Sequence, residues 1–210
     1  MDKSFKRDEK GITGLETAII LIAFVVVAAV FAYTTLSAGL FATQKSQEAV
    51  YSGLKETQGT LEIRGGVVAT ANITGSSGTI KHISFVVSNT LSGEPMDFTP
   101  PTADTSYTGL AASGSSNWVV INYVDEDHTV SDLYWNFTRL SADADNLLEK
   151  NETFTITIGD DTTAGNLVHA LTPDLTVNKT FNIEVLTPFG AVLSIQRTVP
   201  GSIDQVTNLH

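Results

Sequence analysis

The sequence contains no cysteine, so it can form no disulfide framework, thiolate nucleophile, thiolate zinc site or cysteine-ligated iron–sulfur cluster. Positive charge is scarce, because 12 Lys and Arg stand against 23 Asp and Glu and the net charge is −11. This excess of negative charge disfavours a nucleic-acid partner and an anionic lipid surface. The chain also lacks a G-x-x-x-x-G-K-[ST] phosphate loop and a G-x-S-x-G nucleophile elbow, so neither nucleotide binding nor hydrolase chemistry has support.

Two acidic clusters, Asp125 to His128 and Asp160-Asp161, resemble cation sites only superficially. Neither has the alternating ligand spacing of a calcium loop, and no two histidines stand four residues apart. We interpret both clusters as acidic turns. We therefore expect a protein that is not an enzyme, with no catalytic residue, metal, cofactor or small-molecule substrate.

One long apolar run dominates the first quarter of the chain. Residues Thr17 to Gln44 carry no charge, and a bilayer-spanning helix needs only about 20 apolar residues. Four cations precede the run, namely Lys3, Lys6, Arg7 and Lys10. This asymmetry predicts a precursor in the cytoplasmic membrane with a cytoplasmic N-terminus and the remainder outside. No A-x-A site follows the run, so we expect it to be retained in the mature protein.

The helical pattern continues beyond the length that a membrane needs. Apolar and Thr residues recur at intervals of three, four or seven residues, at Leu36, Leu40, Thr43, Val50, Leu54, Thr57 and Leu61. A single helix from residue 12 to residue 62 would be about 75 Å long at ~1.5 Å per residue, more than twice the thickness of a hydrocarbon core. Anchoring alone does not require such a rod.

After Arg64 the pattern changes to short strands separated by turn residues. We predict eight strands: 67–72, 79–88, 118–124, 132–138, 153–158, 167–171, 181–186 and 191–199. Residues 91–116 are expected to form a loop or an irregular edge strand. The predicted fold is α+β, a long N-terminal hydrophobic α-helix followed by an all-β immunoglobulin-like antiparallel sandwich. The predicted segments are a leader 1–11, an assembly helix 12–63 and an outer domain 64–210.

The junction between the charged leader and the apolar run carries the most specific motif. Lys10, Gly11 and Ile12, with Glu16 five positions after the glycine, resemble the processing site of type IV prepilins and archaeal preflagellins. The string ITGLETAIILIAFVVVAAVFAYTTLSAGLFATQKSQEAVYSG resembles the N-terminal helix of archaeal flagellins, or archaellins, and TPFGAVLSIQRTVP is similar to their closing strand. From the residues alone, a plain signal anchor remains an alternative.

The resemblance implies cleavage of the class III, prepilin-like leader between Gly11 and Ile12 by a membrane prepilin-peptidase-like aspartic signal peptidase. It also implies a membrane platform protein, a cytoplasmic assembly and motor ATPase, and identical or paralogous subunits in a helical homopolymer. The expected function is a structural subunit of the rotating, extracellular archaellum filament used for swimming. The alternatives are an adhesive archaeal type IV pilin and a single-pass membrane-anchored surface binding protein.

Two features of the helix bear on assembly. Glu16 is costly in an apolar segment, about 3 kcal/mol if placed deep in hydrocarbon, and the α-amine freed at Ile12 would be a partner for it. The alternative is a glutamate that reaches the lipid headgroups. Lipid is as apolar as the helix, so close packing must supply the preference for other helices. The small residues that would permit it are Ala23, Ala28, Ala29, Ala32, Ala38 and Gly39.

Four N-glycosylation sequons occur, at Asn72, Asn136, Asn151 and Asn178. Chance alone predicts about two in a sequence this rich in Ser and Thr, so the number carries little weight. Asn136 alternates with Trp135 and Phe137 and should point outward. We expect some of the four to be modified.

Overall fold

The computed structural model describes residues 10–90 and 94–209, with side chains described from residue 14. Residues 1–9 of the predicted leader lie outside the described residues. The chain forms two compact units, one ending at Ser52 and the other spanning Gly53–His210. We call the second unit the β-domain. The segment boundaries at 11/12 and 63/64 stay predictions.

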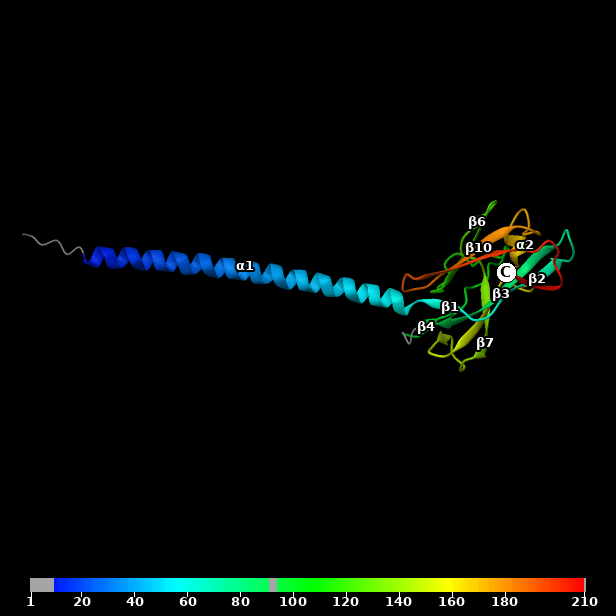
Figure 1. The fold of residues 1–210 in the computed structure, drawn as a ribbon, viewed down its shortest axis with the longest axis horizontal. Coiled ribbons are helices and arrows are strands. Elements are labelled where there is room, and N and C mark those ends of the chain that lie inside the picture. Colours follow the sequence, from blue (N-terminus) through cyan, green and yellow to red (C-terminus); the bar gives the residue numbers. More distant parts are fainter. Residues whose placement is uncertain (1–9, 91–93, 210) are drawn as a thin grey trace, which may run out of the picture. The chain divides into compact units, whose positions relative to one another are not determined.

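The first unit is built on helix α1, Lys10–Gln58 (Figure 1). Residues 12–58 confirm most of the predicted helix, but its predicted extension to residue 62 is wrong. The helix ends at Gln58, and the next residue, Gly59, lies so close to Phe189 that an added Cβ would stand 2.5 Å from the Phe189 Cβ. Three residues later the chain is already a strand, β1, Leu61–Ile63, which pairs with β3 in antiparallel register.

The β-domain contains two principal sheets in which every pairing is antiparallel. The larger sheet has the order β12-β2-β3-β9-β7, with β1 also on β3. Its remaining strands are β2 Val67–Ile73, β3 Thr79–Asn89, β7 Trp135–Ser141, β9 Thr153–Ile158 and β12 Val206–Leu209. The smaller sheet, β11-β10-β5-β6, is formed by β5 Val120–Asp125, β6 Thr129–Val130, β10 Thr180–Leu186 and β11 Val192–Thr198. A short pair, β4 Met96–Asp97 and β8 Leu147–Leu148, completes the strands.

The two principal sheets share one hydrophobic core. Phe85 and Ile156 from the larger sheet belong to the same buried cluster as Ile121 and Ile183 from the smaller one. The predicted alternation is confirmed in β9 and β10, where every second residue is buried. The predicted α+β class, a long helix followed by an antiparallel sandwich, is therefore confirmed.

One predicted strand is wrong, because residues 167–171 contain the short helix α2, Leu167–Ala170. Asn166 starts this helix with a capping box: its side chain accepts a hydrogen bond from Val168 N, and its backbone N–H donates to the His169 ring. The two hydrogen bonds satisfy groups that a helix start would otherwise leave unpaired. Local capping therefore overrides the β-forming composition of the segment.

The stretch predicted as irregular, 91–116, supplies anchors to the core. Met96 and Phe98 are completely buried. The Phe98 ring lies edge-on to Trp135 and Phe154, with ring centroids 6.0 and 5.7 Å apart. The described part of the stretch 91–116 is therefore fixed by aromatic packing, although it has little regular structure.

Candidate functional site

Helix α1 presents apolar side chains to its surroundings over nearly its whole described length. Phe24 and Phe31 are 74% and 71% exposed, and the intervening valines are all more than half exposed. Among the described residues, Gly14–Gln58 is the one helix long and apolar enough to cross a membrane, judged by length and composition. Each such side chain left in water costs about 1.5 kcal/mol or more. The helix therefore requires lipid or protein around it.

The predicted small residues are not spread evenly around α1. At ~100° per residue, Ala28, Ala29, Ala32 and Gly39 fall within one side of the helix, whereas Ala23 falls on the opposite side. A shallow groove follows the first side. It is lined by Phe31, Ala32, Thr35, Leu36, Gly39, Leu40 and Thr43. Small residues flanked by large ones allow another helix backbone to approach closely.

The threonines of α1 satisfy their own hydroxyl groups. Thr35 Oγ1 donates to Phe31 O at 2.8 Å, and Thr43 Oγ1 donates to Gly39 O at 2.9 Å. Thr17, Thr34 and Thr57 make the same type of bond to a carbonyl three or four residues earlier. A hydroxyl paired in this way needs no water, so it does not oppose burial against hydrocarbon or another helix.

The predicted processing residues and Glu16 lie in the first turns of α1. The backbones of Lys10, Gly11 and Ile12 are helical, and their side chains lie outside the described residues. Glu16 is exposed and falls on the same side of the helix as Ala23. Cleavage, the Glu16 pairing and the close packing of the small residues all stay predictions.

The four sequons occupy unequal positions in the β-domain. Asn151 and Asn178 are exposed in turns, with left-handed backbone φ of 66° and 60°. Asn72 is exposed at the end of β2, where its amide nitrogen contacts Thr79 Oγ1 at 3.3 Å. Asn136 lies half-buried within β7, opposite Thr157 of β9, and points outward from the sheet as its alternation predicts.

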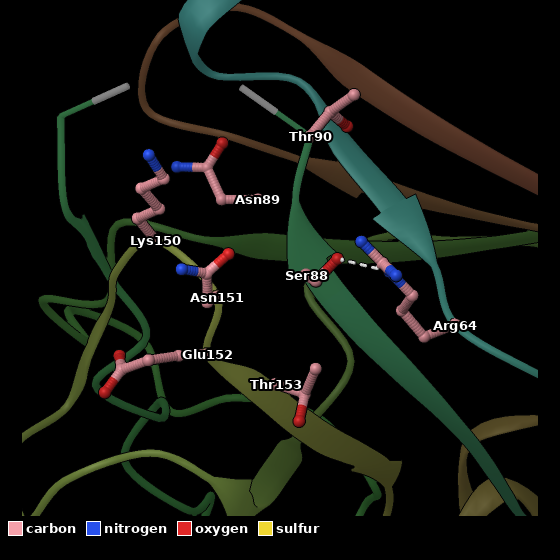
Figure 2. Close-up of a pocket in the computed structure, with 8 residues that line it drawn as sticks. All are labelled: Arg64, Ser88, Asn89, Thr90, Lys150, Asn151, Glu152 and Thr153. Carbon is pink, nitrogen blue, oxygen red and sulfur yellow. Dashed lines mark hydrogen bonds between the residues drawn. The ribbon is translucent and has the colours of Figure 1, made fainter. Parts of the chain in front are cut away.

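A polar pocket of about 230 Å³ lies beside Asn151 (Figure 2). It is lined by Arg64, Ser88, Asn89, Thr90, Lys150, Asn151, Glu152 and Thr153. Arg64 is already engaged, since it pairs with Glu62 and its Nε donates to Ser88 Oγ at 3.0 Å. The Glu152 carboxylate accepts from two backbone N–H groups, those of Asp143 and Glu149. These contacts brace a turn and do not arrange a nucleophile beside a base.

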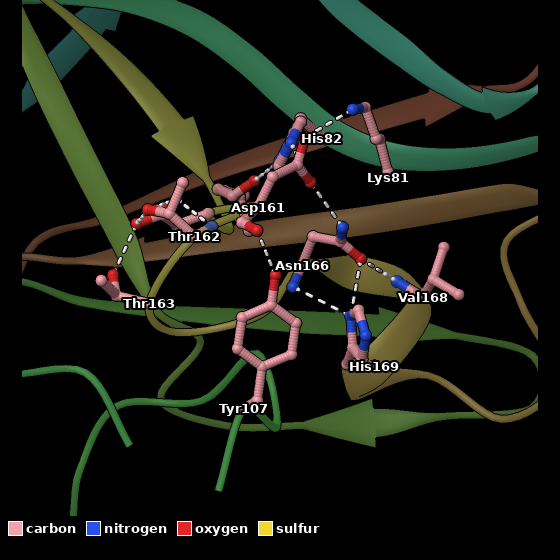
Figure 3. A network of polar contacts seen from close by, with 11 residues as sticks. Lys81, His82, Tyr107, Asp161, Thr162, Thr163, Asn166, Val168 and His169 are labelled. Atoms are coloured by element: carbon pink, nitrogen blue, oxygen red, sulfur yellow. Dashed lines mark hydrogen bonds and ion pairs between the residues drawn. The ribbon is translucent and has the colours of Figure 1, made fainter. Parts of the chain in front are cut away.

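A second polar cluster joins β3 to the segment before α2 (Figure 3). Asp161 pairs with Lys81 Nζ at 2.5 Å and lies 3.0 Å from His82 Nε2, and it accepts a hydrogen bond from Asn166 Nδ2 at 2.7 Å. The Lys81 contact and the other hydrogen bonds hold the pKa of Asp161 well below its ordinary value, against the effect of burial. Tyr107 donates its hydroxyl proton to the Asp161 carbonyl. Within 10–90 and 94–209, no three His, Asp or Glu side chains are placed to hold a metal ion.

The acidic segment Asp125 to His128 forms the turn that the sequence predicts. Asp125 accepts hydrogen bonds from Tyr123 Oη at 2.7 Å and from the backbone N–H groups of Asp127 and His128 at 2.8 and 2.6 Å. Burial alone would raise the pKa of Asp125, but these hydrogen bonds lower it. The Thr172 backbone and Asp125 raise the pKa of His128, against the opposing effect of burial.

We expect this turn to make the β-domain more stable at mildly acidic than at alkaline pH. The folded state holds the His128 proton more tightly than the unfolded chain, whose histidine titrates near 6.5. The stabilisation is therefore complete below about pH 6.5 and disappears as pH rises through the raised pKa. In His128→Gln the free energy of unfolding should vary less over this range.

Both tryptophans, Trp118 and Trp135, lie in the β-domain, so urea titration of tryptophan fluorescence measures the unfolding of this domain on the full chain in detergent. Equal pH slopes in the two proteins would refute the assignment.

Sequence reasoning identified the helix and the acidic turn at Asp160-Asp161, but it missed the polar pocket and the contacts of Asp161 with Lys81, His82 and Asn166. Their members come from segments far apart in the sequence, such as Lys81 and Asp161, or Arg64 and Lys150. The one local signal was Asn166 three residues before His169, which is a cap pattern within an apolar run. The polar pocket and the contacts of Asp161 both depend on strand pairing, so residue spacing in the sequence could not reveal them.

Comparison with known proteins gives a consistent result along the whole chain. A family model described as archaeal-type flagellin matches residues 11–197. The chain is 36% identical to "Probable flagellin 2" of Archaeoglobus fulgidus, over 98% of this chain and 97% of that protein. It is 32% identical to "Probable flagellin 1" of Aeropyrum pernix, over 94% and 95% of the two chains.

Solved structures show the same similarity in three dimensions. The archaeal flagellum of Methanospirillum hungatei matches with a TM-score of 0.58 and 27% identity, covering 93% of this chain and 98% of that one. The crystal structure of archaeal flagellin FlaB1 from Methanocaldococcus jannaschii matches with a TM-score of 0.51 and 10% identity, over 71% and 95% of the chains. The second match concerns the fold alone.

Proposed function

This chain belongs to the archaeal-type flagellin family, and we propose that it enters its filament by losing residues 1–11 and packing α1 against the same helix of other copies. Members of the family are structural subunits of a filament and not enzymes. The chain is accordingly a subunit of a helical homopolymer, the archaeal flagellum, an extracellular appendage that serves motility. An adhesive pilin or a single-pass binding protein is not favoured by the comparisons.

One observation carries the proposed route of assembly: the described part of α1 is exposed on all sides and apolar for most of its length. A helix in this state must pass directly from lipid to protein, because water is a poor solvent for it. Lipid and a helical bundle are equally apolar, so moving α1 from one to the other gains little hydrophobic free energy. The preference for the bundle must then come from close packing, which the groove beside Ala32 and Gly39 supplies. A contact between subunits that repeats without closing into a ring generates a long rod from many copies of one chain.

The proposal includes three kinds of partner outside the filament. A membrane prepilin-peptidase-like enzyme cuts between Gly11 and Ile12 on the cytoplasmic side, while α1 holds the precursor in the cytoplasmic membrane. A membrane platform protein and a cytoplasmic ATPase supply the work of extraction and rotation, for which this chain has no nucleotide-binding loop. Glycans on the exposed sequons Asn151 and Asn178 would cover accessible turns of the β-domain.

The direct test is to collect shed surface fibres, image them by negative staining and determine the N-terminal sequence of their protein. We expect long filaments whose subunit begins ITGLETAII. Filaments whose subunit still begins MDKSFKRDEKG would contradict the proposed processing. A membrane-bound monomer with no fibres would contradict assembly itself. Loss of swimming on deletion of the gene, with attachment to surfaces unchanged, would separate motility from adhesion.

A further inference from the structure

The outward face of the larger sheet is uncharged at its centre. Two rows of paired residues cross its strands, and all of them are half-buried or exposed. The first row follows the register Val68–Ser84–Thr157, and the second follows Val86–Thr155–Thr138. We call these six residues the uncharged face. They alternate along their strands with residues of the core, so they point away from it.

The uncharged face belongs to a chain whose net charge is −11. Charged groups of the same sheet border this face: they lie toward the two ends of β3, and Arg139 follows Thr138 on β7. Glu62 and Arg64 pair near one end, and Lys81 pairs with Asp161 near the other. A solvated protein surface commonly carries interspersed charged side chains, which also keep the protein soluble. Nothing in the packing of the core prevents charged residues at these outward positions.

The uncharged face is also well suited to lose its water. Ser84 Oγ and Thr157 Oγ1 lie 3.1 Å apart and hydrogen-bond to each other across the two strands. Val68 and Val86 have no polar side-chain atom to desolvate. Burying such a surface costs much less than burying unpaired polar groups or charges. Threonine and valine also form a regular pleated surface, which another protein surface can pack against.

We propose that the uncharged face is a contact surface for the β-domain of a second copy of this chain in the filament. The inference rests on the proposed function, because it requires a homopolymer. Each copy carries the same excess of negative charge, so like charges that meet at a repeated contact are penalised at every subunit. Like charges repel each other strongly at contact distance. A surface without charge avoids this repulsion. The hydroxyl groups make the face a poor surface for lipid tails, and the net charge opposes nucleic acid.

The proposal assigns a state to one sequon. Asn136 extends the first row, since it pairs with Thr157 on the outward side of β7. A glycan at Asn136 would stand on the uncharged face and keep a neighbouring β-domain away. We therefore expect Asn136 to be unmodified in assembled subunits, whatever the state of Asn151 and Asn178. Peptide mass spectrometry of wild-type filaments tests this, and a glycan at Asn136 would overturn the proposal.

The absence of cysteine allows a second, direct test with one introduced thiol. Thr155→Cys places the thiol on the uncharged face, and Thr129→Cys is the matched control on β6, beside the acidic turn. A maleimide-linked polyethylene glycol is applied to intact filaments and to detergent-dissociated subunits. We expect Thr155→Cys to react at least tenfold more slowly in filaments than in subunits, while Thr129→Cys reacts at similar rates in both. Equal rates for Thr155→Cys would overturn the proposal.

A measurement on the wild-type protein covers the case in which a variant fails to assemble. Hydroxyl-radical footprinting compares oxidation of peptides containing Val68 and Val86 in filaments and in dissociated subunits. We expect protection of both peptides in the filament, and unchanged oxidation would contradict the proposal. If wild-type filaments do not form at all, the proposed function fails. If they form and leave these peptides unprotected, only the assigned surface fails.

Discussion

Replacing Gly11 with valine is expected to leave the full 210-residue chain in the membrane and to abolish filaments. Gly11 lies in the first turn of α1, since the helix begins at Lys10. The peptidase needs this part of the helix to open before it can cut the chain. Glycine makes opening easier, because it destabilises a helix by about 1 kcal/mol relative to alanine. The prepilin-like pattern also has a small residue at this position, and valine is larger. Without cleavage, the leader with its four cations stays attached to the assembly helix.

The matched control for this substitution is Gly14→Ala. An added Cβ at Gly14 would meet no atom within 4 Å, so this change adds a side chain to the same turn region without a clash. Immunoblots of membranes and of the medium measure precursor and mature protein, which differ by 11 residues. We expect the control to be processed and assembled like the wild type. Filaments from Gly11→Val would contradict this expectation: a shortened subunit would show that another bond is cut, and a full-length subunit would show that no cut is needed.

Replacing Glu16 with glutamine is expected to permit cleavage and to reduce filament yield at least tenfold. Cleavage creates an α-amine at Ile12, four residues before Glu16, and the same amine on neighbouring subunits. In the apolar surroundings of a helical bundle the carboxylate needs this cation. A contact near 4 Å contributes about 4 kcal/mol at an effective dielectric constant of 20. The amide of glutamine keeps the shape of the side chain and loses the charge.

A second glutamate of α1 provides the control for the charge. Glu48 pairs with Lys45 at 2.6 Å, but the two side chains are 70% and 60% exposed. An exposed pair of this kind contributes at most about 1 kcal/mol, so Glu48→Gln should assemble nearly as the wild type does. Pelleting of sheared filaments and N-terminal sequencing of the membrane fraction give yield and processing separately. Normal filaments from Glu16→Gln would contradict the pairing.

The long helix could be predicted because the signal is local and strong. Its uncharged run is longer than the ~20 residues that a bilayer-spanning helix needs, and the sequence alone predicted a helix from residue 12 onward. The end at Gln58 could not be predicted, because the strand that follows it pairs with a segment distant in the sequence. The strand β1 that follows is only three residues long, and its pairing with β3 identifies it.

The sandwich shows the same division between local and distant information. Strands with a clear two-residue alternation, such as β9 and β10, were predicted at nearly their observed bounds. Strand β12 was missed because Val206–Leu209 contains two polar residues among four and gains its structure from pairing with β2. The uncharged face could not be recognised from the sequence, since its rows appear only when β2, β3, β9 and β7 are in register.

The threonines of α1 have a consequence for where a filament can grow. With their protons donated to the helix backbone, α1 moves between a bilayer and a bundle of its own kind without losing hydrogen bonds. Neither environment is strongly preferred, yet both are far better than the surrounding medium. We therefore expect that a broken tip finds no soluble subunits for its repair, and that elongation occurs at the end embedded in the cell.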